Sequence, residues 1–359
     1  AVKAIEVEYQ VLSHFVTDED LEKAVAVKAG EEQTTGDPAR AMQAADFKVE
    51  GYYGIAAITH CCLEPHGQVC EWGDDQSLTA WCSTQNVSGM PGQFADGLKI
   101  PASNVRIITQ YMGSGFGSKF SVDRWGIECA ELARQTNAPV KLMLDRDEEL
   151  AVAGDRPSFY AQIQVGAKKD GTLTAWNSKS WGSGGLMGAG SPPLPYVLQI
   201  PNRKHEHVSI PTNIASSRAW RAPNHPQACF LTMSALEDLA AELRIDALEF
   251  FRRNTAIMGP RSRVYEEELQ ICAELMNWKE KWHPRGRSDS GTVKRGLGLG
   301  LHTWGGRGHR SNCELTVYPD GSVEAKLGSQ DLGTGTRTVV AIVLAETFGL
   351  PLDGVKVSI

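Results

Sequence analysis

The sequence predicts an α+β fold with mixed sheets, in which glycine-rich turns lead from strands into helices. Residues 105–108 are β-branched and predict a short strand, and residues 112–119 then read MGSGFGSK. Apolar positions at helical spacing follow up to about residue 136. The segment QDLGTGT at 330–336 repeats this arrangement before a second predicted helix over about 338–347.

Length and charge limit the class of protein. With 359 residues and 42% hydrophobic content, the chain can form a substantial core and more than one domain. A net charge of −7 argues against binding to nucleic acid or to an anionic membrane surface. No apolar run approaches the roughly 20 residues that span a bilayer.

The remaining elements follow from local patterns. Further strands are predicted over 2–9, 48–58, 78–82, 140–144, 159–165, 173–181, 205–210, 297–303, 313–318, 323–327 and 355–359. Further helices are predicted over 17–25, 89–98, 227–243, 246–254 and 264–278. Polar residues at 30–40 and 284–292 predict loops, and the second is the best candidate for a domain boundary. The segment 182–195 is rich in Gly and Pro and predicts a surface loop beside a pocket.

The glycine-rich segment 112–119 has the general character of an anion-binding loop. Glycines bring bare N–H groups close to a ligand, and the start of the following helix would add partial positive charge. The Walker A motif does not fit, because Ser118 precedes Lys119 and Phe120 follows it. The dinucleotide fingerprint does not fit either, because the glycines are spaced G-x-G-x-G. A tight turn without any ligand remains an alternative.

The eight cysteines include no C-x-x-C pair and match neither ferredoxin spacing, so zinc ribbons, thioredoxin motifs and iron–sulfur clusters are not indicated. His60, Cys61, Cys62 and His66 lie close enough in sequence to form a metal site. The competing interpretation, which is favoured, is that these cysteines pack as small hydrophobes and that His66 is a core histidine with satisfied hydrogen bonds.

Several segments resemble, in order, the molybdenum-cofactor-binding large subunit of the xanthine dehydrogenase/aldehyde oxidase family, closest to bacterial aldehyde oxidoreductases. They read LEPHG at 63–67, TQN at 84–86, MGSGFGSK at 112–119, RAP at 221–223, LEFFRRN at 248–254 and QDLGTGT at 330–336. The resemblance implies the end of an α/β hammerhead domain at 1–28 and a first molybdenum-cofactor-binding domain at 29–284. An incomplete second such domain would occupy 285–359, and we expect the chain to be truncated at both ends.

The resemblance also assigns roles near the reaction centre. Gln85 matches a glutamine whose side-chain amide donates to a molybdenum oxo ligand, and Arg221 matches an arginine that faces the substrate or its developing charge. These two residues are the expected catalytic pair, and both would also contact the cofactor. Phe120 and Trp220 are expected in the substrate pocket.

Other residues are expected to hold a molybdenum pyranopterin, either as molybdopterin or as its cytosine dinucleotide form. Phe116 and Gly117 match a Phe-Gly pair whose backbone lies against the metal, and Gly115 lies in the same loop. The turn that binds the pyranopterin matches Gly333, Thr334 and Gly335. No residue is expected to bind the metal directly.

Departures from the family pattern narrow the activity. Ser114 replaces a glycine, which is a mild change. Phe120 stands where purine-oxidising members carry a glutamate, so an aldehyde or aromatic substrate is favoured over a purine. Ala222 stands where the carbon monoxide-oxidising branch has a copper-bearing cysteine. The family's catalytic glutamate belongs to a Gly-x-Gly-Glu segment that does not occur in residues 1–359.

The sequence therefore predicts molybdenum-dependent hydroxylation of an aldehyde or aromatic small molecule with water-derived oxygen. Electrons would pass to an iron–sulfur subunit, with an FAD subunit completing the complex, in the bacterial cytoplasm or periplasm. The chain alone is expected to be inactive. The first alternative is a catalytically inert cofactor-binding or assembly fragment without the glutamate. The second is a nucleotide-binding protein that uses residues 113–119.

Overall fold

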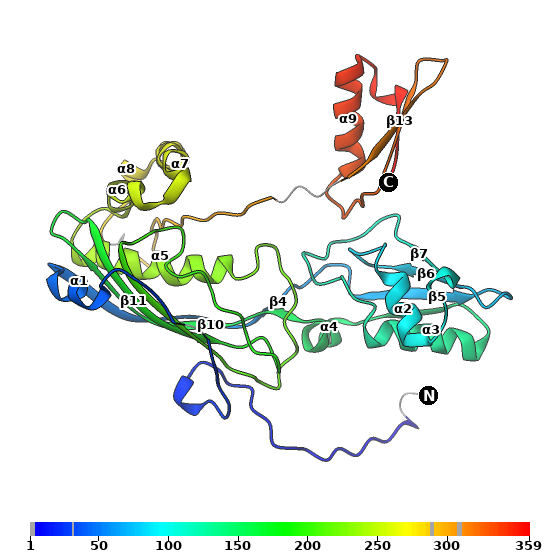
Figure 1. Ribbon diagram of the computed structural model, residues 1–359, viewed down its shortest axis with the longest axis horizontal. Helices are drawn as coiled ribbons and strands as arrows, with labels where there is room; N and C mark the ends of the chain where they lie inside the picture. The colour runs from blue at the N-terminus through cyan, green and yellow to red at the C-terminus, as the bar shows by residue number, and fades with distance from the viewer. Residues whose placement is uncertain (1–3, 31, 288–290, 307–310) are drawn as a thin grey trace. The chain divides into compact units, whose positions relative to one another are not determined.

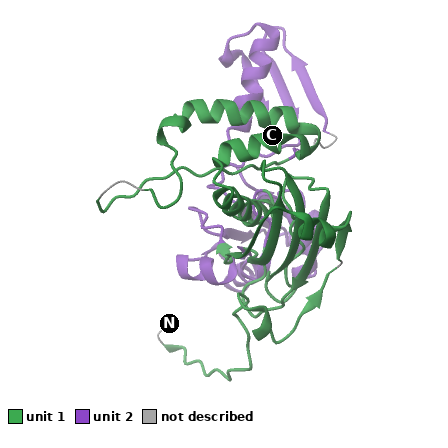
Figure 2. Cartoon of the chain, turned by 90° about the vertical axis from the view of Figure 1, so that its left-hand side faces the viewer, with its two compact units in different colours: residues 1–58, 156–217, 222–304 green, residues 59–155, 218–221, 305–359 purple. Residues whose placement is uncertain are grey.

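The computed structural model describes residues 4–30, 32–287, 291–306 and 311–359 (Figure 1). The chain forms two compact units, which Figure 2 colours separately. Unit 1 comprises residues 1–58, 156–217 and 222–304, and unit 2 comprises residues 59–155, 218–221 and 305–359. Two short strands, β4 (Ile58–Thr59) and β9 (Asp155–Arg156), lie where the chain passes from one unit to the other.

Unit 1 is built on a six-stranded mixed sheet in the order β1-β12-β11-β10-β3, with β2 also paired to β12. Its strands are β1 (Lys28–Ala29), β2 (Gln33–Thr35), β3 (Phe47–Ile55), β10 (Phe159–Ala167), β11 (Leu173–Gly182) and β12 (Asn202–Ser209). β10 and β11 form the expected antiparallel hairpin, whereas β11 and β12 run parallel. The mixed sheet confirms the α+β class.

Unit 1 also contains α-helices and short 3-10 helices. They are η2 (Leu21–Lys23), α1 (Pro38–Ala44), α5 (His225–Glu242), α6 (Ala247–Arg253), η4 (Thr255–Ile257), η5 (Gly259–Arg261), α7 (Ser262–Leu275) and α8 (Trp278–Lys281). The long helix α5 packs against β3 and β10. Phe159 and Ile163 of β10 join Leu236 and Leu239 of α5 in the core, and each buried side chain contributes about 1.5–3 kcal/mol.

A ladder of buried histidines and serines links β11 to β12. The Ser178 hydroxyl lies 3.0 Å from Nδ1 of His205, and the Ser180 hydroxyl lies 2.9 Å from Nδ1 of His207. The other ring nitrogen of His207 donates to the Ala189 carbonyl at 3.0 Å. Burial, reinforced by neighbouring His207, lowers the pKa of His205 to about 4.

This ladder predicts a loss of stability in acid. Unfolded His205 would take up a proton near pH 6.5, whereas the folded side chain does so only near pH 4. The free energy of unfolding should therefore fall as the pH drops through this window, by about 3 kcal/mol in total. Urea titrations at pH 7.5 and 4.5 should show a smaller fall for His205→Gln, whereas His14→Gln, at an exposed position, should keep the wild-type fall. Equal falls in all three proteins would contradict the prediction.

Unit 2 contains a four-stranded sheet in the order β7-β6-β5-β8. Its elements are β5 (Gly67–Trp72), β6 (Leu78–Cys82), α2 (Met90–Leu98), η3 (Ala102–Asn104), β7 (Val105–Ile108), α3 (Asp123–Thr136), β8 (Val140–Met143) and α4 (Arg146–Val152). α3 packs against β5 and β8, and α2 packs against β7. Leu78, Phe94 and Cys129 are fully buried between these layers.

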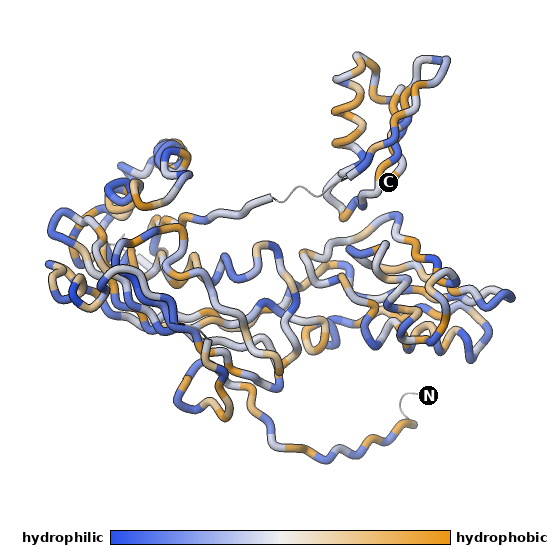
Figure 3. Tube along the Cα trace, viewed as in Figure 1, coloured by the Kyte–Doolittle hydropathy of each residue, from blue (hydrophilic) through white to orange (hydrophobic). Residues whose placement is uncertain are grey.

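Unit 2 also contains a three-stranded sheet, β13-β14-β15, with one helix packed against β15. The elements are β13 (Cys313–Val317), β14 (Val323–Leu327), α9 (Thr336–Phe348), η6 (Leu352–Gly354) and β15 (Val355–Ser358). Figure 3 shows that α9 is rich in hydrophobic residues, and Val339 and Val343 are largely exposed. Within the described residues, no helix is both long and apolar enough to cross a membrane.

Several predicted elements are wrong. Residues 4–9 form no strand, since both faces of this alternating segment are exposed, and the predicted helix over 17–25 is reduced to η2. The predicted loop over 30–40 contains β2 and the start of α1, which Asp37 caps. Residues 297–303 form no strand. They are held instead by side chains, since Glu237 accepts from the amide of Leu299.

Most of the other predicted elements are confirmed, including β6, β7 and α2. The predicted boundary at 284–292 includes residues 288–290, which lie outside the described residues. The division into 1–28, 29–284 and 285–359 stays a prediction.

Candidate functional site

All the residues predicted for the site lie in unit 2, around the glycine-rich loop of residues 112–119. The loop follows β7, as predicted, but α3 begins only at Asp123. The N–H of Val122, the residue that precedes the helix, is engaged, because it donates to Gln93 Oε1 at 2.8 Å. The helix therefore begins beyond the loop, and its contribution to the loop's positive potential stays a prediction. Within the loop, the N–H groups of Gly113, Gly117, Ser118 and Lys119 already donate to other groups of the chain.

The loop adopts a backbone that few residues tolerate. Ser114, Phe116 and Gly117 have φ values of 80°, 53° and 112°. Positive φ in a non-glycine residue is uncommon and clusters at functional sites. A Cβ atom on Gly115 would lie 2.5 Å from Gln85 Oε1, and one on Gly117 would lie 2.3 Å from the carbonyl oxygen of Ala219. Glycine is required at both positions because neighbouring segments approach the loop so closely.

Gln85 lies shortly after β6, and its side chain contacts the glycine-rich loop. Its Oε1 accepts from the N–H of Gly117 at 2.8 Å and from the N–H of Lys119 at 3.4 Å. Because these partners can only donate, they fix which end of the amide is oxygen. The side-chain Nε2 has no hydrogen-bond partner among the described residues. Gln85 therefore presents a free N–H₂ donor beside the loop, as the predicted role requires.

The segment Arg218–Arg221 is docked directly on the loop. The N–H of Arg221 donates to the carbonyl of Phe116 at 2.8 Å. Arg218 binds Asp123 with both guanidinium nitrogens, at 2.6 and 2.9 Å, and donates to the carbonyl of Ser118 at 2.9 Å. The structure thus brings the backbone of Arg221 to Phe116, with the Arg221 side chain exposed.

His60 supports the same segment. Its Nε2 lies 2.9 Å from the carbonyl oxygen of Ala219, and its ring stacks on Trp220 with 4.7 Å between ring centroids. His60 is buried, so these contacts hold Trp220 beside the loop. The sequence analysis missed the supporting roles of His60, Arg218 and Asp123. No local pattern could have revealed the Arg218–Asp123 pair, because its members are 95 positions apart.

Two aromatic side chains of the loop remain accessible. The rings of Phe116 and Phe120 are each 45% exposed. The backbone of Phe120 is held in place, because its carbonyl accepts from the side-chain amides of Asn86 at 3.1 Å and Gln93 at 3.2 Å. Phe120 therefore presents an apolar ring at a fixed position, and it offers no carboxylate that could bind a purine.

In the second glycine-rich turn, several backbone N–H groups already donate to a side chain of the same turn. The carboxylate of Asp331 accepts from the N–H groups of Gly333 at 3.0 Å, Gly335 at 3.1 Å and Arg337 at 3.3 Å. Burial would raise the pKa of Asp331, but these backbone hydrogen bonds outweigh it and lower that pKa. The amides of Gly333 and Gly335 are thus engaged, whereas the N–H of Thr334, between them, donates to no group among the described residues.

The two glycine-rich segments contact the same strand end. Gln330 Nε2 donates to the carbonyl of Thr84 at 2.5 Å, next to Gln85. A Cβ atom on Gly333 would lie 3.0 Å from the carbonyl oxygen of Met112, at the start of the first loop. The predicted cofactor-binding residues of both segments are therefore gathered around Gln85.

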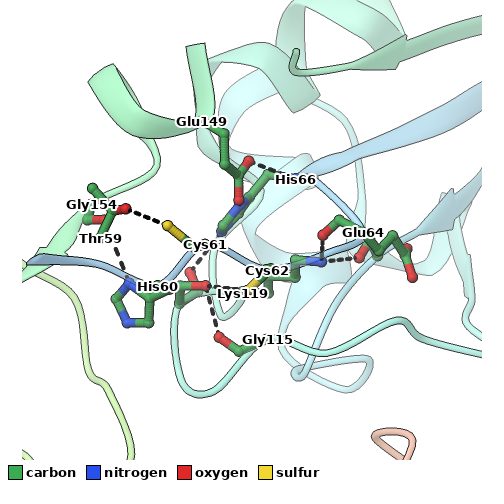
Figure 4. A network of polar contacts seen from close by, with 12 residues as sticks. Thr59, His60, Cys61, Cys62, Glu64, His66, Gly115, Lys119, Glu149 and Gly154 are labelled. Carbon is green, nitrogen blue, oxygen red and sulfur yellow. Dashed lines mark hydrogen bonds and ion pairs between the residues drawn. The ribbon is translucent and has the colours of Figure 1, made fainter. Parts of the chain in front are cut away.

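The alternatives raised by the sequence are not supported by the geometry. His66 Nδ1 lies 2.8 Å from Glu149 Oε1, with both side chains buried, which confirms a satisfied core histidine. In the described part of the chain, no cluster of His, Cys, Asp and Glu could hold a metal. Lys119 is 1% exposed, and its ammonium lies against the backbone of Glu64 (Figure 4), so it does not resemble a phosphate-binding lysine.

The donors left over around the loop fit a group rich in anionic oxygens. The Ser114 hydroxyl is buried without a hydrogen-bond partner within the described residues. Gln85 Nε2 is a second donor without a partner among the described residues, and the glycines allow a ligand to approach the backbone. Preorganised N–H and O–H donors of this kind stabilise oxo and phosphate oxygens.

The chain is similar to known proteins in sequence and in fold. Two family models, both described as molybdopterin cofactor-binding domain, match residues 18–255 and 271–359. The aldehyde oxidoreductase molybdenum-binding subunit PaoC of Escherichia coli O157:H7 is 29% identical over 338 residues, covering 91% of this chain and 46% of that protein. The putative xanthine dehydrogenase molybdenum-binding subunit XdhA of Escherichia coli K12 is 28% identical, covering 99% and 51%. The chain thus spans about half the length of the curated relatives it matches.

Solved structures share the fold. Quinoline 2-oxidoreductase from Pseudomonas putida 86 has a TM-score of 0.76 and 17% identity, covering 98% of this chain and 51% of that one. Aldehyde oxidoreductase from Desulfovibrio desulfuricans has a TM-score of 0.72 and 17% identity, covering 93% and 39%. With family models that match most of the sequence, this chain belongs to the molybdopterin cofactor-binding domain family.

Proposed function

We propose that this chain is the molybdenum-cofactor-binding part of a molybdenum hydroxylase that oxidises an aldehyde or aromatic substrate with water-derived oxygen. The observation that carries the proposal is the Gln85 side chain. Its Oε1 is fixed by the N–H groups of Gly117 and Lys119, and its Nε2 is left as a donor beside the loop. The two curated relatives described above are named as molybdenum-binding subunits of an aldehyde oxidoreductase and of a putative xanthine dehydrogenase.

A molybdenum pyranopterin would supply the two-electron redox centre when bound. Gln85 Nε2 and the backbone N–H groups of Gly115 and Phe116 would hold its oxygens, Gly117 would let the cofactor approach the loop closely, and Thr334 would contact the pterin. The guanidinium of Arg221, docked on this loop through its own N–H, would stabilise negative charge that develops on the substrate. Trp220 and Phe120 would exclude water and orient an apolar substrate.

The electrons of a two-electron oxidation must leave the site, and partner subunits with iron–sulfur clusters and FAD are the acceptors we propose. The word subunit in the names of the relatives supports a multi-subunit enzyme. Similarity to proteins of Escherichia coli supports a bacterial enzyme, in the cytoplasm or the periplasm. The nucleotide form of the pterin stays open between molybdopterin and its cytosine dinucleotide.

The substrate preference tests this proposal. In the full-length enzyme, an aromatic aldehyde should be oxidised with a far higher kcat/KM than xanthine, because the Phe120 ring is apolar and accessible. Phe120→Glu should lower kcat/KM for the aldehyde by about tenfold or more, because loss of apolar contact and an added charge each disfavour it. Leu132→Glu, at an exposed position of α3, is the matched control and should leave it unchanged.

A preference for xanthine would contradict this assignment of substrate. An enzyme that carries the cofactor but oxidises no aldehyde or aromatic compound would favour the alternative, a catalytically inert cofactor-binding chain.

A further inference from the structure

Lys119 belongs to the glycine-rich loop, but its side chain is buried and not exposed to solvent. Its side chain is 1% exposed, and Nζ donates to the carbonyl of Glu64 and to the hydroxyl of Ser83, both at 2.7 Å (Figure 4). Burial lowers the pKa of Lys119, although the nearby Glu64 carboxylate opposes this shift. Placing an ammonium group in such surroundings is costly unless hydrogen-bond acceptors replace its lost hydration.

The backbone of Lys119 is bonded to the segment that carries Gln85. The carbonyl of Lys119 accepts from the N–H of Gln85 at 2.8 Å and from the Thr84 hydroxyl at 3.1 Å. The N–H of Lys119 donates to Gln85 Oε1 at 3.4 Å. The side chain and the backbone of one residue therefore hold both Ser83 and Gln85.

The other end of the loop is tied to the same support. The carboxylate of Glu64 accepts from the N–H of Gly113, and the N–H of Glu64 donates to the carbonyl of Gly113 at 3.3 Å. Two residues further on, Nε2 of His66 lies 3.3 Å from the carbonyl oxygen of Ser118. The buried Glu149 carboxylate accepts from the N–H of His66 at 2.9 Å. Lys119 binds Glu64, Glu64 binds Gly113, and His66 binds Ser118, so these contacts together fix the loop at Gly113 and at Ser118.

We propose that Lys119 is a positioning residue for Gln85: by joining Glu64 and Ser83 to the loop, it keeps Gln85 Oε1 on the loop amides and so presents Nε2 to the cofactor. The inference rests on the proposed function for the identity of that cofactor. It does not make Lys119 a ligand, because two acceptors hold its ammonium on the buried side of the loop.

The test uses Lys119→Met, which keeps an unbranched chain but removes the donors and the charge. In the full-length enzyme with its partner subunits, it should lower kcat by about 10- to 100-fold, the usual effect of losing a supporting partner around a metal centre. KM and molybdenum content should change little. In a Gln85→Ala background, Lys119→Met should lower kcat by less than about twofold, because residues that act through one another are not additive.

A second readout does not depend on activity. Amide hydrogen exchange at residues 112–119 should be faster in Lys119→Met, because the N–H of Gly117 loses its fixed acceptor on Gln85. Lys141→Met, at an exposed lysine of β8, is the matched control and should change neither exchange nor kcat. If Lys119→Met does not fold, Ser83→Ala removes one acceptor of Nζ and should show the same non-additivity with Gln85→Ala.

Two results would overturn the inference. One is that Lys119→Met lowers kcat as strongly in the Gln85→Ala background as in the wild type. The other is that exchange at residues 112–119 and kcat both stay at the wild-type values. A wild-type enzyme without molybdenum would instead refute the proposed function, and the exchange experiment would still report whether Lys119 fixes Gln85.

Discussion

Gly117→Ala is expected to lower kcat/KM of the full-length enzyme by at least about 100-fold. A displacement of about 1 Å in a segment that positions reacting groups can cost a factor of this size. A Cβ atom at this position would lie 2.3 Å from the carbonyl oxygen of Ala219 and 2.8 Å from its carbon. Neither backbone atom can rotate away, so the segment Arg218–Arg221 must move off the loop. Alanine at a φ of 112° adds further strain.

The matched control for this substitution is Gly92→Ala. A Cβ atom on Gly92 meets nothing within 4 Å, and Gly92 lies inside α2, where alanine is favoured over glycine by about 1 kcal/mol. Gly92→Ala should therefore keep activity and be as stable as the wild type or more so. Circular dichroism would establish that both variants are folded. Equal activity of the two variants would mean that the docking of Arg218–Arg221 on the loop is unimportant.

Arg221→Ala is expected to lower kcat/KM by about 100-fold, the effect of removing one preorganised donor from a developing charge. The substitution isolates the side chain, because the N–H of Arg221 that bonds to Phe116 is kept in alanine. The exposed side chain also makes a loss of folding stability small. Elemental analysis should therefore find the wild-type molybdenum content in this variant, whereas steady-state kinetics should show the loss of kcat/KM.

Two further variants sharpen the test of Arg221. Arg221→Lys should recover little of the rate, since an ammonium group lacks the planar fork of the guanidinium. Arg124→Ala removes an arginine whose side chain is 89% exposed and is paired with Glu128 on the surface of α3, so it should leave kinetics unchanged. If Arg221→Ala has wild-type kinetics, its assigned catalytic role is wrong.

Local sequence patterns were sufficient for the parts of the site that follow regular elements. The strand β6 places Gln85 at its end, and the β-branched strand β7 leads into the glycine-rich loop, both as the sequence predicted. The resemblance to a family then assigned roles that periodicity alone could not provide. The same patterns indicated a helix after the loop without fixing its first residue, and α3 begins at Asp123 without a side-chain cap.

Side-chain hydrogen bonds and contacts formed only in the folded chain account for what the sequence could not predict. The Asp331 carboxylate accepts hydrogen bonds from the N–H groups of the second turn. This arrangement depends on side-chain geometry within a few residues. Arg218 finds Asp123 only after the chain folds, and Lys119 is directed into the core although its motif suggests a surface cation. The alternation at residues 4–9 predicted a strand, but alternation specifies a strand only where a partner buries one face.

Molybdenum content is the most direct measurement for the proposed function. The complete protein should be expressed together with its neighbouring open reading frames, and its metals should be determined by elemental analysis. We predict roughly stoichiometric molybdenum, with release of a pterin on denaturation. A complex without molybdenum, purified under conditions that load other molybdoenzymes, would contradict the proposed function and would leave the shared fold as the sole common feature.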